Sequence, residues 1–74
     1  MNTTISDEAV LKSLRHAQRK LSDKRDARIH LKSAEGFYKV SQRSNDEASR
    51  YRWLTWSMRH ISLAQSASRL RADA

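Results

Sequence analysis

The sequence predicts an all-α fold, and three observations favour this class. It contains no proline and one glycine in 74 residues, so the residues that usually interrupt helices and form tight turns are almost absent. Residues such as Ala, Leu, Lys, Arg and Glu, which are favourable in helices, dominate the composition. Apolar residues recur at helical spacing. We therefore expect a single helical domain over residues 1–74.

The first expected helix covers about residues 7–42. Ser6 precedes two acidic residues, which favours a helix start because a hydroxyl can cap the first turn and carboxylates suit the positive end of the helix dipole. Its apolar positions fall into two sets, Val10, Leu11, Leu14, Ala17 and Leu21, and then Ala27, Leu31, Ala34 and Tyr38. The sets differ in phase by about a quarter turn. Either one helix twists its buried face across residues 22–28, or two helices meet at Ser22.

Gly36 is a candidate end for this helix, because glycine is common just beyond a helix C-terminus. However, Glu35 and Lys39 are spaced as a favourable pair one turn apart, and a glycine inside a helix costs only about 1 kcal/mol. We therefore expect the helix to continue through Gly36.

The second expected helix covers about residues 45–71 and follows a capped turn at residues 43–45. Two pairs of residues favour this start: Ser44 with Glu47 as a capping box, and Asp46 with Arg50 one turn apart. The two helices are therefore expected to form an antiparallel helical hairpin.

The second helix carries two apolar faces. One consists of Trp53, Trp56, His60, Leu63, Ala67 and Leu70, and the other of Tyr51, Leu54, Met58 and Ile61. A hairpin covers only one of them, because the first helix offers one opposing stripe. We therefore expect a homodimer, in which two hairpins form a four-helix arrangement. Trp53, Trp56 and Leu63 are expected to be core positions, and His60 a packed core histidine.

Two alternatives to the dimer remain open. The first helix could break at Ser22 to give a three-helix monomer, or one aromatic face could stay exposed for a foreign protein. The dimer is preferred because a core of this size seldom supplies more than about 3–5 kcal/mol without a disulfide, a metal or a partner. The chain has no cysteine. His16, His30 and His60 have no Cys or carboxylate neighbours at ligand spacing, so no metal site is expected.

The charge of the chain is positive and regional. The net charge is +7, and ten basic residues between Lys12 and Arg43 accompany only three acidic ones. Five of the basic residues share one side of the first expected helix: Arg25, Arg28, Lys32, Lys39 and Arg43. This basic stripe could engage an acidic protein surface or follow a phosphate backbone.

The sequence contains no catalytic motif. It has no paired carboxylates, no Ser/His/Asp grouping and no glycine-rich phosphate loop, so we expect no enzyme, no cofactor and no small-molecule substrate. The N-terminus lacks the features of a signal peptide, and no stretch approaches the roughly 20 apolar residues that cross a bilayer. We expect no membrane association and a cytoplasmic location.

In size, charge and helical character, the chain resembles the short, basic, helical accessory proteins of bacteriophages, such as those of the early region of lambda-like phages. The resemblance implies a regulatory role directed at host machinery in a bacterial cytoplasm, and it transfers no site. We therefore expect a non-enzymatic dimeric binding protein that engages an acidic macromolecular partner. The alternative is non-specific binding of nucleic acid through the same basic stripe.

Overall fold

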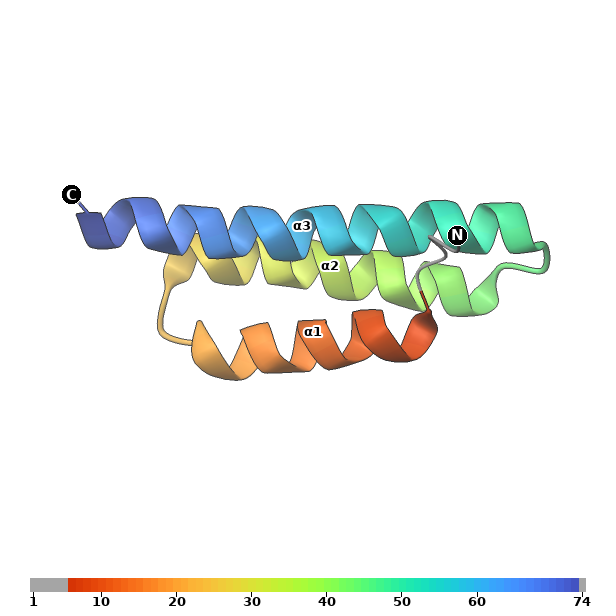
Figure 1. Cartoon of the computed structure of the whole chain (residues 1–74), viewed down its shortest axis with the longest axis horizontal. Coiled ribbons are helices and arrows are strands. Elements are labelled where there is room, and N and C mark those ends of the chain that lie inside the picture. Colours follow the sequence, from red (N-terminus) through yellow and green to blue (C-terminus); the bar gives the residue numbers. More distant parts are fainter. Residues whose placement is uncertain (1–5, 74) are drawn as a thin grey trace, which may run out of the picture.

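The computed structural model describes residues 6–73, with their side chains as far as residue 67, and in this part of the chain it contains three helices and no strand. They are α1 (Asp7–Lys20), α2 (Arg25–Arg43) and α3 (Glu47–Asp73). Helix α2 runs antiparallel to both α1 and α3 (Figure 1). The predicted all-α class is therefore confirmed.

The single helix expected over residues 7–42 is instead two helices. Helix α1 ends at Lys20 with Leu21 as its C-cap, and α2 begins at Arg25. A tight turn joins them, in which the Lys24 N–H donates to the Leu21 carbonyl at 3.0 Å. The reason is the quarter-turn change of phase. One straight helix could not turn both apolar sets toward α3, whereas two helices bury Leu14 and Leu31 in the same core.

The predicted N-cap of α1 is confirmed, whereas the predicted N-cap of α3 is wrong. Ser6 caps α1, because its Oγ accepts a hydrogen bond from the Ala9 N–H at 3.1 Å. At the second turn the cap is Asp46 rather than Ser44, since the Asp46 carboxylate accepts from the Ser49 N–H at 3.1 Å. The Ser44 hydroxyl instead donates to the Val40 carbonyl at 3.0 Å, at the end of α2.

Gly36 lies inside α2, as expected, and it does not have a positive φ. A Cβ added at this position would meet no atom within 4 Å. Glycine is therefore not required at this position, either by the backbone conformation or by the available space.

The core consists of aliphatic and small side chains. Ten buried apolar residues form it: Val10, Leu14, Ala17, Leu21, Ala27, Leu31, Ala34, Leu54, Ile61 and Ala64. Two fully buried serines, Ser41 and Ser57, satisfy their hydroxyls on backbone carbonyls of α2. The Ser57 hydroxyl donates across from α3 to the Ala34 carbonyl at 2.8 Å, so α2 and α3 approach closely here. No aromatic side chain is buried in this core.

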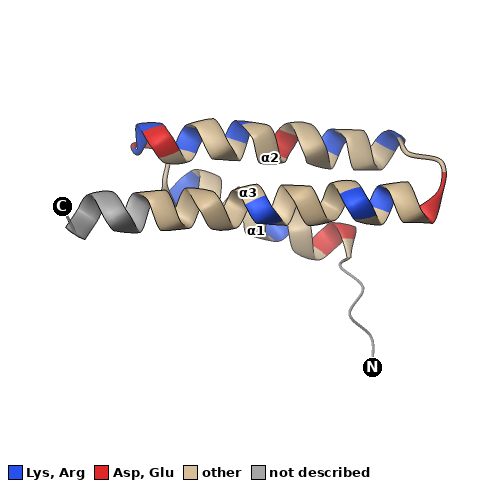
Figure 2. Ribbon diagram, turned by 90° about the horizontal axis from the view of Figure 1, so that it is seen from above, with Lys and Arg blue, Asp and Glu red and all other residues tan. Residues whose placement is uncertain are grey.

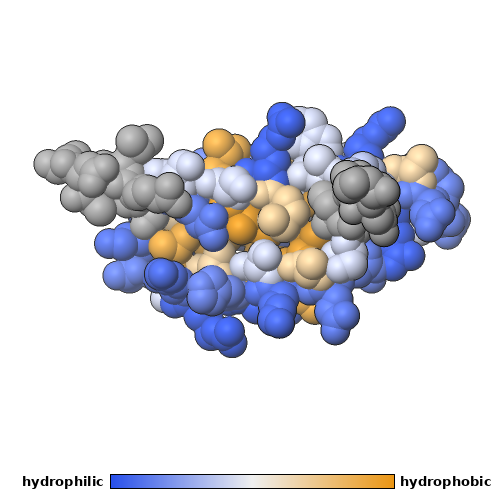
Figure 3. All heavy atoms as spheres, viewed as in Figure 1, coloured by the Kyte–Doolittle hydropathy of each residue, from blue (hydrophilic) through white to orange (hydrophobic). Residues whose placement is uncertain are grey.

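Helix α1 covers one side of the α2–α3 pair and leaves the opposite side open. It packs against both of the other helices, although most contacts between helices join α2 and α3. In the view of Figure 1, patches of apolar atoms lie between α3 and α1, with hydrophilic atoms around them (Figure 3). None of the described helices is long and apolar enough to cross a membrane.

Candidate interaction surfaces

The open side of the α2–α3 pair carries a cluster of rings centred on Phe37. The Phe37 ring stacks on Trp53 with centroids 5.6 Å apart and an angle of 12° between the planes. It also contacts Trp56 at 6.1 Å and His60 at 5.4 Å. His30 extends the cluster along α2, with its ring centroid 5.5 Å from that of His60. We call these five residues, together with Leu63 on the same side of α3, the open aromatic face.

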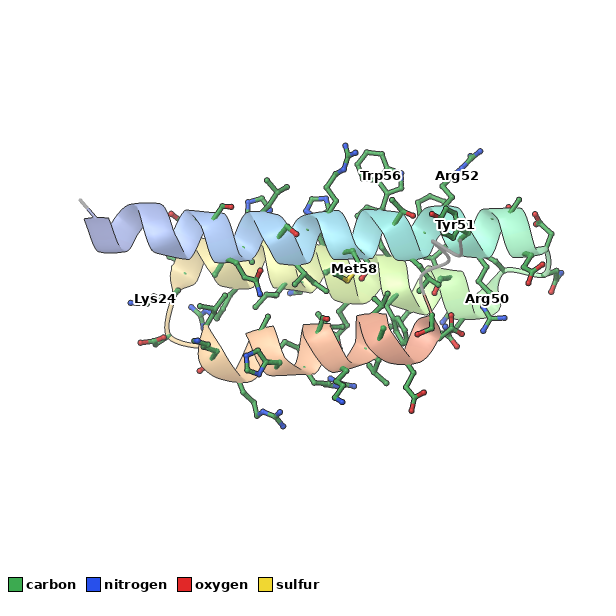
Figure 4. All side chains as sticks on the ribbon, in the orientation of Figure 1. Lys24, Arg50, Tyr51, Arg52, Trp56 and Met58 are labelled. Carbon is green, nitrogen blue, oxygen red and sulfur yellow. The ribbon has the colours of Figure 1, made fainter. Side chains whose placement is uncertain are left out.

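Two large apolar side chains on this face are exposed to solvent: Trp56 is 41% exposed and Leu63 42%. Ile29, which is 61% exposed, lies instead beside Arg25, Arg28 and Lys32 of the basic stripe. Trp56 projects from α3 on the side away from α1, whereas Met58 lies toward α1 (Figure 4). The guanidinium of Arg59 lies over the Trp56 ring, 5.1 Å from its centroid. Such contacts stabilise only modestly where solvent is present.

These exposures correct the expectation that Trp56 and Leu63 are core positions, because in the single chain both side chains meet solvent. Trp53 and His60 are half-buried at the edge of the core. On the other apolar face of α3, Leu54 and Ile61 are core residues and Met58 packs against them, as expected. Leu70 lies outside the described side chains.

The actual seam of α3 consists of Leu54, Ser57, Ile61 and Ala64, all of them buried. Their spacing of 3, 4 and 3 is the spacing of a helix-pair seam. Ser57 and Ala64 lie between the two apolar faces, so the spacing of the large apolar residues does not indicate this seam. The signal was present, since small residues allow two helices to approach closely where large ones do not.

The basic stripe lies wholly on α2. Arg25, Arg28, Lys32, Lys39 and Arg43 are all exposed. Figure 2 shows basic positions recurring along the whole length of α2. In residues 47–67 of α3 the basic residues are Arg50, Arg52 and Arg59, and residues 60–67 include no Lys or Arg. The two surfaces therefore differ in character: one is positively charged, and the other is mainly apolar and aromatic.

Two carboxylates are stabilised in their charged form. The hydrogen bond from Arg50 lowers the pKa of Asp7 below its usual value, with a smaller contribution from Gln42. Arg50 thus pairs with Asp7 of α1. The sequence spacing had predicted Asp46 as its partner instead. At the start of α3, the backbone N–H of Ser49 lowers the pKa of Asp46. Both carboxylates form their hydrogen bonds at a helix start, and neither lies on the open aromatic face.

No group of three or more His, Cys, Asp or Glu side chains is placed to hold a metal ion among the described residues. His30 and His60 nevertheless meet across α2 and α3, with their Nδ1 atoms 3.3 Å apart. Spacing along the sequence gave no indication of this pair.

Known proteins offer no match to the chain: no family model fits it, and no curated protein or solved structure is significantly similar to it. The function is therefore inferred from the two surfaces of the three-helix bundle.

Proposed function

We propose that this protein is a non-enzymatic, dimeric helical binding protein that engages an acidic macromolecular partner through the basic stripe. The observation that carries the proposal is the exposure of all five stripe residues along one helix. From Arg25 to Arg43 such a line extends over roughly 27 Å at the rise of an α-helix. Cations held on a rigid helix steer an acidic surface toward it and fix its register.

The open aromatic face supports the dimeric part of this proposal. Two copies that meet through this face would place α2, α3 and their counterparts in a central four-helix arrangement, with each α1 on the outside. Large exposed apolar patches are a common feature of protein interaction sites. The basic stripes of both copies would stay available to the partner.

The resemblance to phage accessory proteins suggests the kind of partner to test first, which is an acidic protein of a bacterial host. Non-specific binding of nucleic acid is the second candidate, because the guanidinium groups of the stripe also suit phosphate oxygens. The two candidates differ in their salt dependence and in their sensitivity to nuclease.

The test reverses two charges of the stripe. Arg28→Glu with Lys32→Glu should abolish binding to an acidic probe such as polyglutamate and to the partner captured from bacterial lysate. Helicity should remain, since exposed charges rarely contribute more than about 1 kcal/mol to stability. Lys12→Glu with Arg19→Glu is the matched control, because it makes the same change in net charge on exposed positions of α1.

Two results would decide between the candidates. Binding that survives nuclease in the parent and in the control, but not in the stripe variant, supports the acidic protein partner. Captured material that disappears with nuclease, together with a fall of about two in the slope of log affinity against log salt for the stripe variant, supports nucleic acid. Equal binding by all three proteins would show that the stripe is only a solvated surface.

A further inference from the structure

The solvent side of α2 carries apolar side chains in addition to the basic stripe. Ile29 is 61% exposed, the highest value among the large apolar side chains of the described chain, and Val40 is 41% exposed. Their separation along the helix corresponds to three turns and about 16 Å, so both point to the same side. Gly36 lies between them and is also exposed, and a Cβ added there would meet no atom within 4 Å. We call Ile29, Gly36 and Val40 the outer row of α2.

The basic stripe follows one edge of the outer row. Three of its cations line a shallow hollow together with Ile29: Arg25, Arg28 and Lys32. Val40 lies one turn before Arg43, so it too has a cation as its helical neighbour. The outer row is therefore bordered by positive charge at both of its ends.

The carboxylates of α2 lie away from this surface. Asp26 and Glu35 are half-buried, whereas all five cations of the stripe are exposed. Glu35 lines a hollow between α1 and α2, beside Gln18. The solvent side of α2 thus combines exposed apolar side chains with positive charge that no exposed carboxylate of the same helix offsets.

This combination distinguishes between the possible occupants of the surface. A second copy of the chain would bring two basic stripes together, which like-charge repulsion opposes. A phosphate backbone would pair with the cations but offers no apolar group to Ile29 and Val40. An amphipathic helix with an apolar stripe and carboxylates beside it complements both features at once.

We propose that the acidic partner presents an amphipathic helix that lies along α2, with its apolar residues on Ile29 and Val40 and its carboxylates on the basic stripe. This inference rests on the proposed function and specifies the partner. Because the outer row extends over three turns, the partner helix needs apolar residues that recur once per turn over the same length. The low point at Gly36 accommodates one of these side chains between the two ends of the row.

The experiment compares three acidic probes on the full chain by calorimetry. The first is a peptide of about 18 Leu and Glu residues, long enough to match the stripe, with its Leu residues on one side of a helix. The second has the same composition in scrambled order, and the third is polyglutamate. The parent should bind the amphipathic peptide at least about tenfold more tightly than the scrambled one, because only the former presents apolar anchors together. Circular dichroism of the mixture should show that this peptide becomes helical on binding.

Two pairs of substitutions test the outer row. Ile29→Gln with Val40→Gln should bind the amphipathic peptide no better than the scrambled one, while binding of polyglutamate and the dimeric state remain as in the parent. Ile29→Leu with Val40→Leu keeps the apolar contact and should bind as the parent does. Unchanged polyglutamate binding and an unchanged melting curve show that the Gln variant is folded.

Trp56→Gln with Leu63→Gln is the matched control, because it removes two exposed apolar side chains from the open aromatic face instead. It should bind the amphipathic peptide as the parent does. Loss of peptide binding in this control alone would overturn the inference, since the peptide would then occupy the aromatic face. Loss of the dimer in the Gln variant of the outer row would also overturn it, because the row would then join two copies.

The remaining outcomes separate this inference from the proposed function. If the parent binds all three probes equally but Arg28→Glu with Lys32→Glu abolishes their binding, the stripe recognises acidic charge and the inference about a helix is wrong. If the charge-reversed variant binds polyglutamate like the parent, the proposed function itself fails. Binding to vesicles of anionic phospholipid that requires Ile29 and Val40, without a preference for the amphipathic peptide, would assign the outer row to a membrane surface and overturn the inference.

Discussion

At the scale of the residue, side-chain size decides which positions of α3 meet the other helices. Ser57 and Ala64 are fully buried, whereas Trp56, the neighbour of Ser57, is 41% exposed. A small side chain lets two helix backbones approach, and the hydroxyl of Ser57 finds the Ala34 carbonyl at that close approach. The large rings of α3 lie at the edge of the interface with α2, where Trp53 stacks on Phe37 and Trp56 contacts it at a tilt.

Gly36 leads to the first prediction at this scale. Gly36→Ala should raise the free energy of unfolding by about 0.4–1 kcal/mol, because alanine reduces the conformational freedom of the unfolded chain and favours the helix. The added Cβ meets open space, so no clash offsets the gain. Chemical denaturation monitored by circular dichroism measures the change. An unchanged or lower stability would mean that Gly36 has a role in contact with another molecule.

At the scale of the element, the three helices are defined by their ends. Ser6 caps α1 and Asp46 caps α3, each by accepting a backbone N–H three residues later. Helix α2 begins at Arg25 without a side-chain cap, so tertiary packing must hold this end. The ion pair between Asp7 and Arg50 ties the start of α1 to the first turns of α3.

The second prediction concerns this ion pair in acid. The pKa of Asp7 is lowered in the folded protein, chiefly by the hydrogen bond from Arg50. The charged carboxylate therefore stabilises the fold above the unfolded value of about 3.9, and this contribution is lost as the pH falls through the lower folded pKa. Asp7→Asn should cost no more than about 1 kcal/mol near pH 7, because the pair is partly solvated. At an acidic pH below the folded pKa, where the parent carboxyl is also neutral, this difference should shrink.

Thermal melts of the parent and variant at both pH values measure this effect. Glu8→Gln serves as the control, because it removes the same charge from an exposed position in the first turn of α1. A difference between parent and Asp7→Asn that does not change with pH would show that the ion pair contributes nothing.

At the scale of the whole molecule, no helix of the described chain packs on one side of the α2–α3 pair. Helix α1 packs on the α2–α3 pair from one side, and Trp56 of the open aromatic face projects from the other (Figure 4). The core beneath α1 is built mainly from alanine, serine and aliphatic residues. A small core of this kind is typical of domains that gain stability from a partner.

The third prediction is that the protein is a homodimer at micromolar concentration. Trp56→Gln with Leu63→Gln should give a folded monomer, because both side chains are exposed in the single chain and would become buried only in the dimer. Tyr51→Gln is the matched control, since Tyr51 is 42% exposed on α3 but belongs to a different side of that helix. Sedimentation equilibrium distinguishes the states. A parent that remains a folded monomer of 8.6 kDa over this range would exclude the dimer.

The sequence by itself determined the features that depend on a few neighbouring residues. The all-α class, the Ser6 cap, the continuity of the helix through Gly36 and the presence of two apolar faces on α3 all follow from propensity and periodicity within one or two turns. The same local signals located the basic stripe on one side of α2 and showed that α3 had more apolar surface than one neighbouring helix could cover.

Only the tertiary structure decided which of two locally equivalent options the chain adopts. The change of phase after Leu21 allowed a twisted helix or a break, and the chain breaks because α1 and α2 can then both face α3. Either apolar face of α3 could have formed the core. The seam instead joins Leu54 and Ile61 of one face to Ser57 and Ala64 beside it, because small residues allow the closest helix approach. The partner of Arg50 and the meeting of His30 with His60 were decided in the same way, since contacts between distant residues depend on how the helices pack, which no local pattern specifies.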